Sequence, residues 1–135
     1  MNILRQNKCL NFEAPFMYLL LGKSKALLLD SGATQNANTF PIRDTVESLL
    51  TQKYGAERSN ISLIVAHSHA HGDHTSGDGQ FQGQANTEVV GTAQAAVAEF
   101  FKIANWPNEI VTFDLGNRII DVIPIPGHQD AHIAL

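Results

Sequence analysis

The sequence predicts an α/β domain, because segments with the pattern of β-strands alternate with segments that have the pattern of α-helices. Short apolar runs rich in β-branched residues indicate buried strands, and Ile61–Ala66 is the clearest of these runs. Helical periodicity is seen where apolar residues recur at i, i+4, i+7 and i+8, at Ile42, Val46, Leu49 and Leu50.

The first half of the chain is predicted to contain a β-hairpin and a helix before the Ile61–Ala66 strand. Phe16–Leu21 and Ala26–Leu29 are apolar and flank a short turn, as paired strands do. Residues 31–38 are rich in turn-forming side chains and are predicted to be a loop. Pro41 is placed in the first turn of the following helix, which is predicted to end before Gly55.

The second half is predicted to contain a second helix between strands. Thr87–Val90 is predicted as a short strand, and Thr92 is predicted to cap the helix that follows. The expected buried stripe of that helix is Ala93, Val97, Phe100, Phe101 and Ala104. Ile110–Phe113 and Ile119–Ile125 are predicted to form two further strands around a Gly-Asn turn.

All six histidines lie in two short islands, residues 66–74 and 126–132, and this distribution indicates a metal site. Imidazole is the commonest nitrogen ligand for zinc. The first island follows a predicted buried strand, so its histidines lie at the rim of a sheet, where α/β folds tend to bind ligands. Histidines two apart in an extended chain point to the same side, so His67 with His69, or His69 with His71, can share one ion.

The segment Ser68–His74 reads Ser-His-Ala-His-Gly-Asp-His and resembles the His-x-His-x-Asp-His signature of the metallo-β-lactamase superfamily of metal-dependent hydrolases. The register that fits this signature contains His69, His71, Asp73 and His74. Residues 26–32 are similar to an early strand of that family that ends in Asp-x-Gly, and residues 121–128 to a later strand that leads into Pro-Gly-His. The resemblance extends from about Phe16 to Leu135 and implies the αββα sandwich of the family.

The resemblance also implies which residues bind metal. His69, His71 and His128 are expected to form a three-histidine zinc site with an open fourth position, the arrangement of a catalytic zinc. Asp73 and His74 resemble the ligands of a second metal. Asp73 is also the expected catalytic residue, because its carboxylate can hold the hydroxide between two metals and accept a proton during turnover.

Neighbouring polar residues are expected to support these ligands. Asp30 is expected to hydrogen-bond the metal-binding loop, as partners of ligand histidines do. Ser68 is expected to orient that loop by bonding to backbone. His132 is expected to lie outside the ligand set or to face the substrate, and His67 to be a strand-end residue or an outer partner. Trp106 is interpreted as a packing residue.

These expectations describe a zinc-dependent hydrolase in which metal-bound hydroxide attacks an ester, thioester, lactone, amide or phosphoester. Ile133–Leu135 is predicted to open another strand, and the sequence stops before the later aspartate and histidine that complete the second metal site of the family. Residues 1–135 are therefore interpreted as one domain whose C-terminal part is missing, with one zinc site complete and the second partial. The alternative is a non-catalytic zinc-binding module or an inactive, truncated remnant of such a hydrolase.

Composition favours a cytoplasmic protein that acts on a small molecule. Nine basic and thirteen acidic side chains give a net charge of −4, which disfavours a nucleic-acid groove and hence a nuclease. No signal-peptide pattern or membrane span is recognised, and the single Cys9 excludes an intrachain disulfide. Because strands that would cover the Ile119–Ile125 region are missing, exposed sheet edges are expected, and these edges can support self-association.

Overall fold

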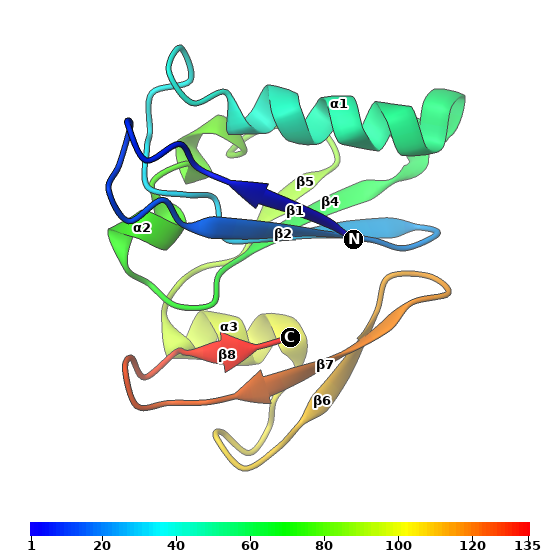
Figure 1. Cartoon of the computed structure of the whole chain (residues 1–135). Helices are drawn as coiled ribbons and strands as arrows, with labels where there is room; N and C mark the ends of the chain where they lie inside the picture. Colours follow the sequence, from blue (N-terminus) through cyan, green and yellow to red (C-terminus); the bar gives the residue numbers. More distant parts are fainter.

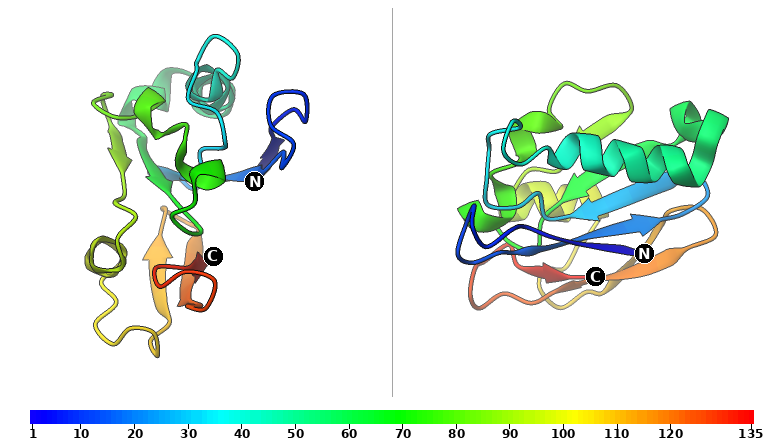
Figure 2. Two further views of the ribbon diagram at one scale, coloured as in Figure 1. Left: turned by 90° about the vertical axis from the view of Figure 1, so that its left-hand side faces the viewer. Right: turned by 45° about the horizontal axis from the view of Figure 1, so that its top comes forward.

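The computed structural model describes residues 1–135 and contains two β-sheets with helices packed against them (Figure 1). Helix α1 (Ile42–Tyr54) covers one face of the larger sheet. The smaller sheet and helix α3 (Gln94–Phe101) lie on the other side of the larger sheet, as the views in Figure 2 also show. The predicted α/β class is confirmed.

The larger sheet has five strands in the order β1-β2-β3-β4-β5. Their bounds are Asn2–Arg5 (β1), Phe16–Leu21 (β2), Lys25–Leu29 (β3), Ser62–Ala66 (β4) and Thr87–Val89 (β5). The pairs β1–β2 and β2–β3 are antiparallel, whereas β3–β4 and β4–β5 are parallel. The smaller, antiparallel sheet contains Val111–Asp114 (β6), Ile119–Pro124 (β7) and Ile133–Ala134 (β8).

Strands β3 and β4 are buried on both faces, as expected of continuous apolar runs in parallel pairing. Leu28 and Val65 pack toward α1, whereas Leu27 and Ile64 pack toward the smaller sheet and α3. On the α1 side, the helix contributes three side chains that are at most 2% exposed, Ile42, Val46 and Leu50. The larger sheet is therefore the shared wall between two hydrophobic clusters.

The parallel pairing of β3 and β4 brings two loops to the same edge of the sheet. Leu29, the last residue of β3, is paired in register with Ala66, the last residue of β4. Asp30 and His67 follow these two residues and therefore begin their loops side by side. Three short helical turns flank β4 in the chain: η1 (Gly55–Asn60) precedes it, and α2 (Gly72–Thr75) and η2 (Asp78–Gln80) follow it.

Some local expectations were wrong. Thr92 does not cap α3: Ala93 is the N-cap residue and no side chain caps this helix end. Ala93 and Ala104 are exposed rather than part of the buried stripe. The helix ends at Phe101 because Lys102 adopts a left-handed conformation (φ 61°), and its N–H donates to the carbonyls of the last turn.

No helix has both the length and the apolar character that are needed to cross a membrane.

Candidate metal centre

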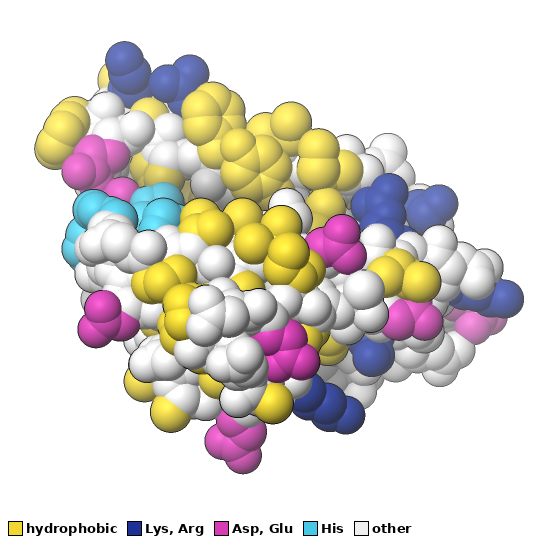
Figure 3. Space-filling view, turned by 90° about the horizontal axis from the view of Figure 1, so that it is seen from below, with side chains coloured by type: hydrophobic (Ala, Val, Ile, Leu, Met, Phe, Trp, Pro, Cys, Tyr) yellow, Lys and Arg dark blue, Asp and Glu magenta, His cyan; other side chains and the backbone are white.

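The two histidine islands meet at one end of the molecule. The loop after β4 carries His69 and His71 to the start of α2, and the loop between β7 and β8 carries His128. Figure 3 shows the histidine side chains gathered at one edge of the surface. The site is therefore assembled from the ends of strands in both sheets.

Three histidine nitrogens converge on one point. One ligand atom from each of His69, His71 and His128 lies within 4.8 Å of the others. His71 Nδ1 is 3.2 Å from His69 Nε2 and 3.0 Å from His128 Nε2. One ring nitrogen carries a single proton or lone pair, so it cannot form full hydrogen bonds with both neighbours. Two ligands of a tetrahedral zinc ion, each at about 2.0–2.1 Å, stand roughly 3.3 Å apart, so this donor set fits zinc.

The protonation of His69 also suits metal binding. Burial, together with the four neighbouring histidine rings, lowers the pKa of His69 to about 4. The imidazole is therefore neutral at pH 7, and the neutral form is the one that binds metal. His71 and His128 are exposed, so a ligand in solution can reach the point where the three nitrogens converge.

Asp73 and His74 face each other beside the three histidines. His74 Nε2 is 3.0 Å from Asp73 Oδ2, and His74 Nδ1 is 2.7 Å from Asp30 Oδ2. The hydrogen bond to Asp30 raises the pKa of His74 above its ordinary value, although burial opposes this effect. Asp30 thus holds one ring nitrogen, which directs the other toward Asp73. A carboxylate commonly orients a metal-ligating histidine in this way.

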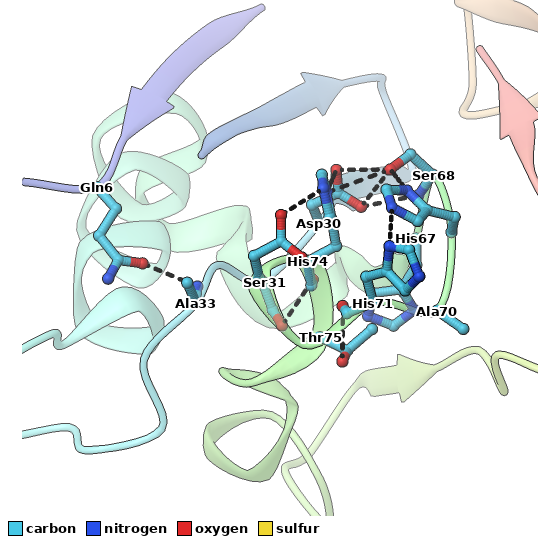
Figure 4. Close-up of polar contacts among 12 residues, drawn as sticks. Gln6, Asp30, Ser31, Ala33, His67, Ser68, Ala70, His71, His74 and Thr75 are labelled. Atoms are coloured by element: carbon cyan, nitrogen blue, oxygen red, sulfur yellow. Dashed lines mark hydrogen bonds and ion pairs between the residues drawn. The ribbon is translucent and has the colours of Figure 1, made fainter. Parts of the chain in front are cut away.

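Asp30 is buried and accepts hydrogen bonds from several groups of the loop that follows β4 (Figure 4). It accepts hydrogen bonds from the backbone N–H of Ser68 at 2.7 Å and from Ser68 Oγ at 3.0 Å. Its backbone has a positive φ of 68°, a conformation that is uncommon outside glycine and that directs the carboxylate toward β4. Ser68 Oγ also lies 3.1 Å from His69 Nδ1. Asp30 therefore contacts the ring of His74, and Ser68 Oγ contacts the rings of both His69 and His74, rather than the backbone as expected.

The backbone of the metal-binding loop is fixed to its neighbours on several sides. The carbonyl of Ser68 accepts from the N–H of Ile133 in β8, at 2.9 Å. The carbonyl of His74 accepts from the N–H of Ser31, at 2.8 Å. The side-chain oxygen of Gln129 accepts from the N–H of Ala70 at 2.9 Å, which links the two histidine islands directly.

Gln6 and Gln129 are positioning residues that the sequence analysis missed. Gln6 is 2% exposed, and its side-chain oxygen accepts from the N–H of Ala33 at 2.8 Å. It thereby fixes the loop that follows Asp30. No local pattern marks Gln6, because its partner is 27 positions away. Gln129 lies between His128 and His132, and its position in a histidine island was the one available signal.

Besides His74, two further histidines, His67 and His132, lie outside the group of three. His132 is close to it, with its ring centroid 4.9 Å from that of His69, and burial lowers the pKa of His132. The ring of His67 points elsewhere: His67 Nε2 lies 2.8 Å from Asp78 Oδ1. The convergent pair within the first island is therefore His69 and His71.

A hollow of about 490 Å³ borders His128, one of the three converging histidines. It is lined by residues 92–94 and 128–131, so the start of α3 faces the His128 loop across it. A larger hollow of about 840 Å³ lies between the turns at residues 22–24 and 116–118, at the opposite end of β3. The larger hollow contains no histidine, so we assign the candidate site to the smaller one.

Comparisons with known proteins agree with this geometry. The sequence model of the metallo-beta-lactamase superfamily matches residues 10–135. Among solved structures, the MIM-2 metallo-beta-lactamase is similar in fold, with a TM-score of 0.57 and 22% sequence identity. The alignment covers 87% of this chain and 48% of that one, so the chain spans about half the length of the MIM-2 structure. No curated protein matches the sequence at a significant level.

Proposed function

The chain belongs to the metallo-β-lactamase superfamily of metal-dependent hydrolases, and from this premise we propose that it forms the metal centre of a zinc-dependent hydrolase. The observation that carries the proposal is the convergence of His69, His71 and His128 nitrogens within 4.8 Å. Three histidines with an open fourth side are a donor set of catalytic zinc sites.

The proposed division of roles follows from the contacts around the three histidines. Zinc held there supplies a Lewis acid and lowers the pKa of water to about 7. Asp73 is the proposed catalytic residue: its carboxylate can accept a proton from a water or a substrate placed on the open side. His74, fixed by Asp30, lies 3.0 Å from that carboxylate and can restrain it.

The proposed substrate is a small molecule with a hydrolysable ester, thioester, lactone, amide or phosphoester bond. It would enter the 490 Å³ hollow, where Thr92, Gln94 and Gln129 offer neutral hydrogen-bonding groups. A cytoplasmic location is part of the proposal. The number of ions is also proposed: within this chain the second set has two protein ligands, Asp73 and His74, so a second ion should bind more weakly than the first.

Metal analysis and calorimetric zinc titration of the folded chain test the metal centre. We expect one tightly bound zinc per chain and no tight binding after His71→Ala. His132→Asn is the matched control, because it removes a nearby histidine that is not in the group of three, and it should leave the stoichiometry unchanged. A wild-type protein without stoichiometric zinc, or a His71→Ala variant that retains it, contradicts the proposal.

The alternative is a zinc-binding module without turnover. It is favoured by the contact between Asp73 and His74, 3.0 Å apart, because these two residues face each other and are not in the group of three converging histidines. Rate measurements on a panel of thioesters, lactones and β-lactams separate the two proposals. Hydrolysis that is abolished by a chelator and restored by zinc supports the hydrolase. Tight zinc binding with no turnover on any of these classes supports the module.

A further inference from the structure

His67 and Asp78 stand at the two ends of the segment that carries most of the proposed ligands. His67 Nε2 lies 2.8 Å from Asp78 Oδ1, although the two residues are 11 positions apart in sequence. Between them lie His69, His71, Asp73 and His74. The contact therefore closes the metal-binding loop at its base.

Asp78 also connects this base to the neighbouring strand. The carboxylate oxygen that faces His67 accepts a hydrogen bond from Ser31 Oγ, at 2.7 Å. Ser31 follows β3, whereas His67 follows β4, so one carboxylate holds the ends of both strands. The segment after α2 is thereby fixed relative to the sheet.

The burial of His67 indicates that its contact with Asp78 offsets the cost of placing an imidazole in the interior. The side chain is 3% exposed, and its Nδ1 atom is buried without a hydrogen-bond partner. A buried polar atom without a partner destabilises the folded state, and an apolar side chain at the end of β4 would avoid that loss. An imidazole at this position can hydrogen-bond to Asp78, whereas an apolar side chain cannot.

We infer that the His67–Asp78 contact is a clasp that pre-organises the loop for metal binding. The inference rests on the metal centre of the proposed function, and neither residue is in the group of three ligands. When the clasp is closed, the loss of chain entropy from bringing the loop ends together occurs during folding. This loss therefore does not oppose metal binding. His67 and Asp78 are thus positioning residues that raise metal affinity without touching the ion.

Zinc affinity of the full chain, measured by calorimetric titration against a competing chelator, tests the clasp. His67→Leu preserves bulk and removes the donor, and Asp78→Ala removes the acceptor. Each change should weaken zinc binding by about 10- to 100-fold, the usual effect of losing an outer partner of a metal site. The double variant should bind about as weakly as Asp78→Ala alone, because Asp78→Ala already removes the contact with His67 as well as the hydrogen bond from Ser31.

Two further variants separate positioning from general stability. His67→Gln places an amide donor near the position of Nε2 and should retain nearly the wild-type affinity. Glu47→Gln breaks the ion pairs of Glu47 with Arg43 and Arg58, away from the loop, and should lower the unfolding temperature of the metal-free protein without changing zinc affinity. If His67→Leu does not fold, Asp78→Ala answers the same question, because its side chain is partly exposed.

The outcomes distinguish the clasp from the metal centre itself. A wild-type protein that binds no zinc overturns the proposed function and the clasp with it. A wild-type protein that binds zinc, with unchanged affinity in His67→Leu and Asp78→Ala, overturns the clasp alone. A fall in unfolding temperature without a fall in affinity has the same meaning, because it shows a purely structural contact.

Discussion

At the scale of single residues, the proposed metal centre depends on carboxylates that hold histidines as much as on the histidines themselves. Asp30 contacts His74 and Ser68, and Asp78 contacts His67 and Ser31. Each carboxylate stands near the end of a buried strand or just beyond the ligand loop, where one side chain can restrain two segments. Asp30 restrains the ring of His74 directly, and Ser68, which Asp30 holds, contacts the ring of His69.

Removal of the Asp30 carboxylate should impair metal binding. Asp30→Ala takes away the partner of His74 Nδ1 and the acceptor of the Ser68 N–H. We expect a loss of zinc affinity of about 10- to 100-fold, because outer partners of ligand histidines have effects of this size. A competition titration measures it. Asp44→Ala, at an exposed position in the first turn of α1, is the control, and equal affinities in both variants would contradict the role of Asp30.

At the scale of elements, the close approach of two loops requires glycine at one position. A Cβ at Gly77 would lie 2.3 Å from the carbonyl oxygen of Ser31, which is backbone and cannot move away easily. At Gly79, two positions later in the same segment, a Cβ would meet nothing within 4 Å. The loop after β3 and the segment after α2 can therefore meet at the metal centre only while residue 77 has no side chain.

This pair of glycines gives a matched stability test. Gly77→Ala should lower the free energy of unfolding by about 1–3 kcal/mol, the usual cost of overpacking. Gly79→Ala should change it little, because the added methyl group is free of contacts. Denaturant unfolding of both variants measures the difference. Equal stabilities would show that the Gly77 segment moves away without cost.

The α1–η1 junction predicts a dependence of stability on pH. Glu47 pairs with Arg43 and Arg58, each at 2.7 Å. Burial raises the pKa of Glu47, but the hydrogen bond from Arg58 and the two positive charges outweigh it and hold the pKa below the ordinary 4.5. Because the folded-state pKa is lowered, the stabilisation is full above pH 4.5 and is lost as the pH falls through the folded-state value.

Glu47→Gln should therefore destabilise the protein at pH 7 and not at low pH. Because the pair is partly exposed, we expect a loss of about 0.2–1 kcal/mol at pH 7. The difference between the variant and the wild type should shrink as the pH falls below 4.5. Denaturant unfolding at a series of pH values measures it, and a difference that is constant with pH would contradict the assignment.

The elements also show what the sequence could and could not predict. Strands with continuous apolar runs, such as Ile61–Ala66, and a helix with regular apolar spacing were predicted near their observed bounds, because burial determines both patterns. β1 was missed because an edge strand of four residues, half exposed, has little pattern. The α3 cap was misplaced because the helix starts without any side-chain cap.

For the candidate metal centre, the histidine islands and the hydrogen-bonding role of Asp30 were visible in the sequence, but three other supporting residues were not. The convergence of His69, His71 and His128 could be expected from a signature pattern. The roles of Gln6, Gln129 and Asp78 depend on partners that are 27, 59 and 11 positions away. Such contacts form only after distant strands have paired, so no short stretch of sequence around one residue indicates its partner.

At the scale of the whole molecule, the surface retains apolar side chains that the two hydrophobic clusters do not cover. Ile119, the first residue of β7, is 68% exposed, and Ile110, just before β6, is 62% exposed; Ile125, just past β7, is 43% exposed. Figure 3 shows hydrophobic side chains spread over the face that is seen from below. The smaller sheet also has open edges at β6 and β8. Open edges beside apolar side chains favour pairing with another chain.

Self-association of the chain should therefore depend on concentration and on the smaller sheet. Ile110→Lys introduces a charge beside edge strand β6, as natural sheets do to prevent edge pairing, and should shift the equilibrium toward monomer. Phe12→Lys, at a position that is 81% exposed in the loop between β1 and β2, is the control and should leave association unchanged. Sedimentation equilibrium over a range of concentrations measures both. A wild-type chain that stays monomeric at every concentration contradicts the prediction, and equal effects of the two variants would place the contact outside the smaller sheet.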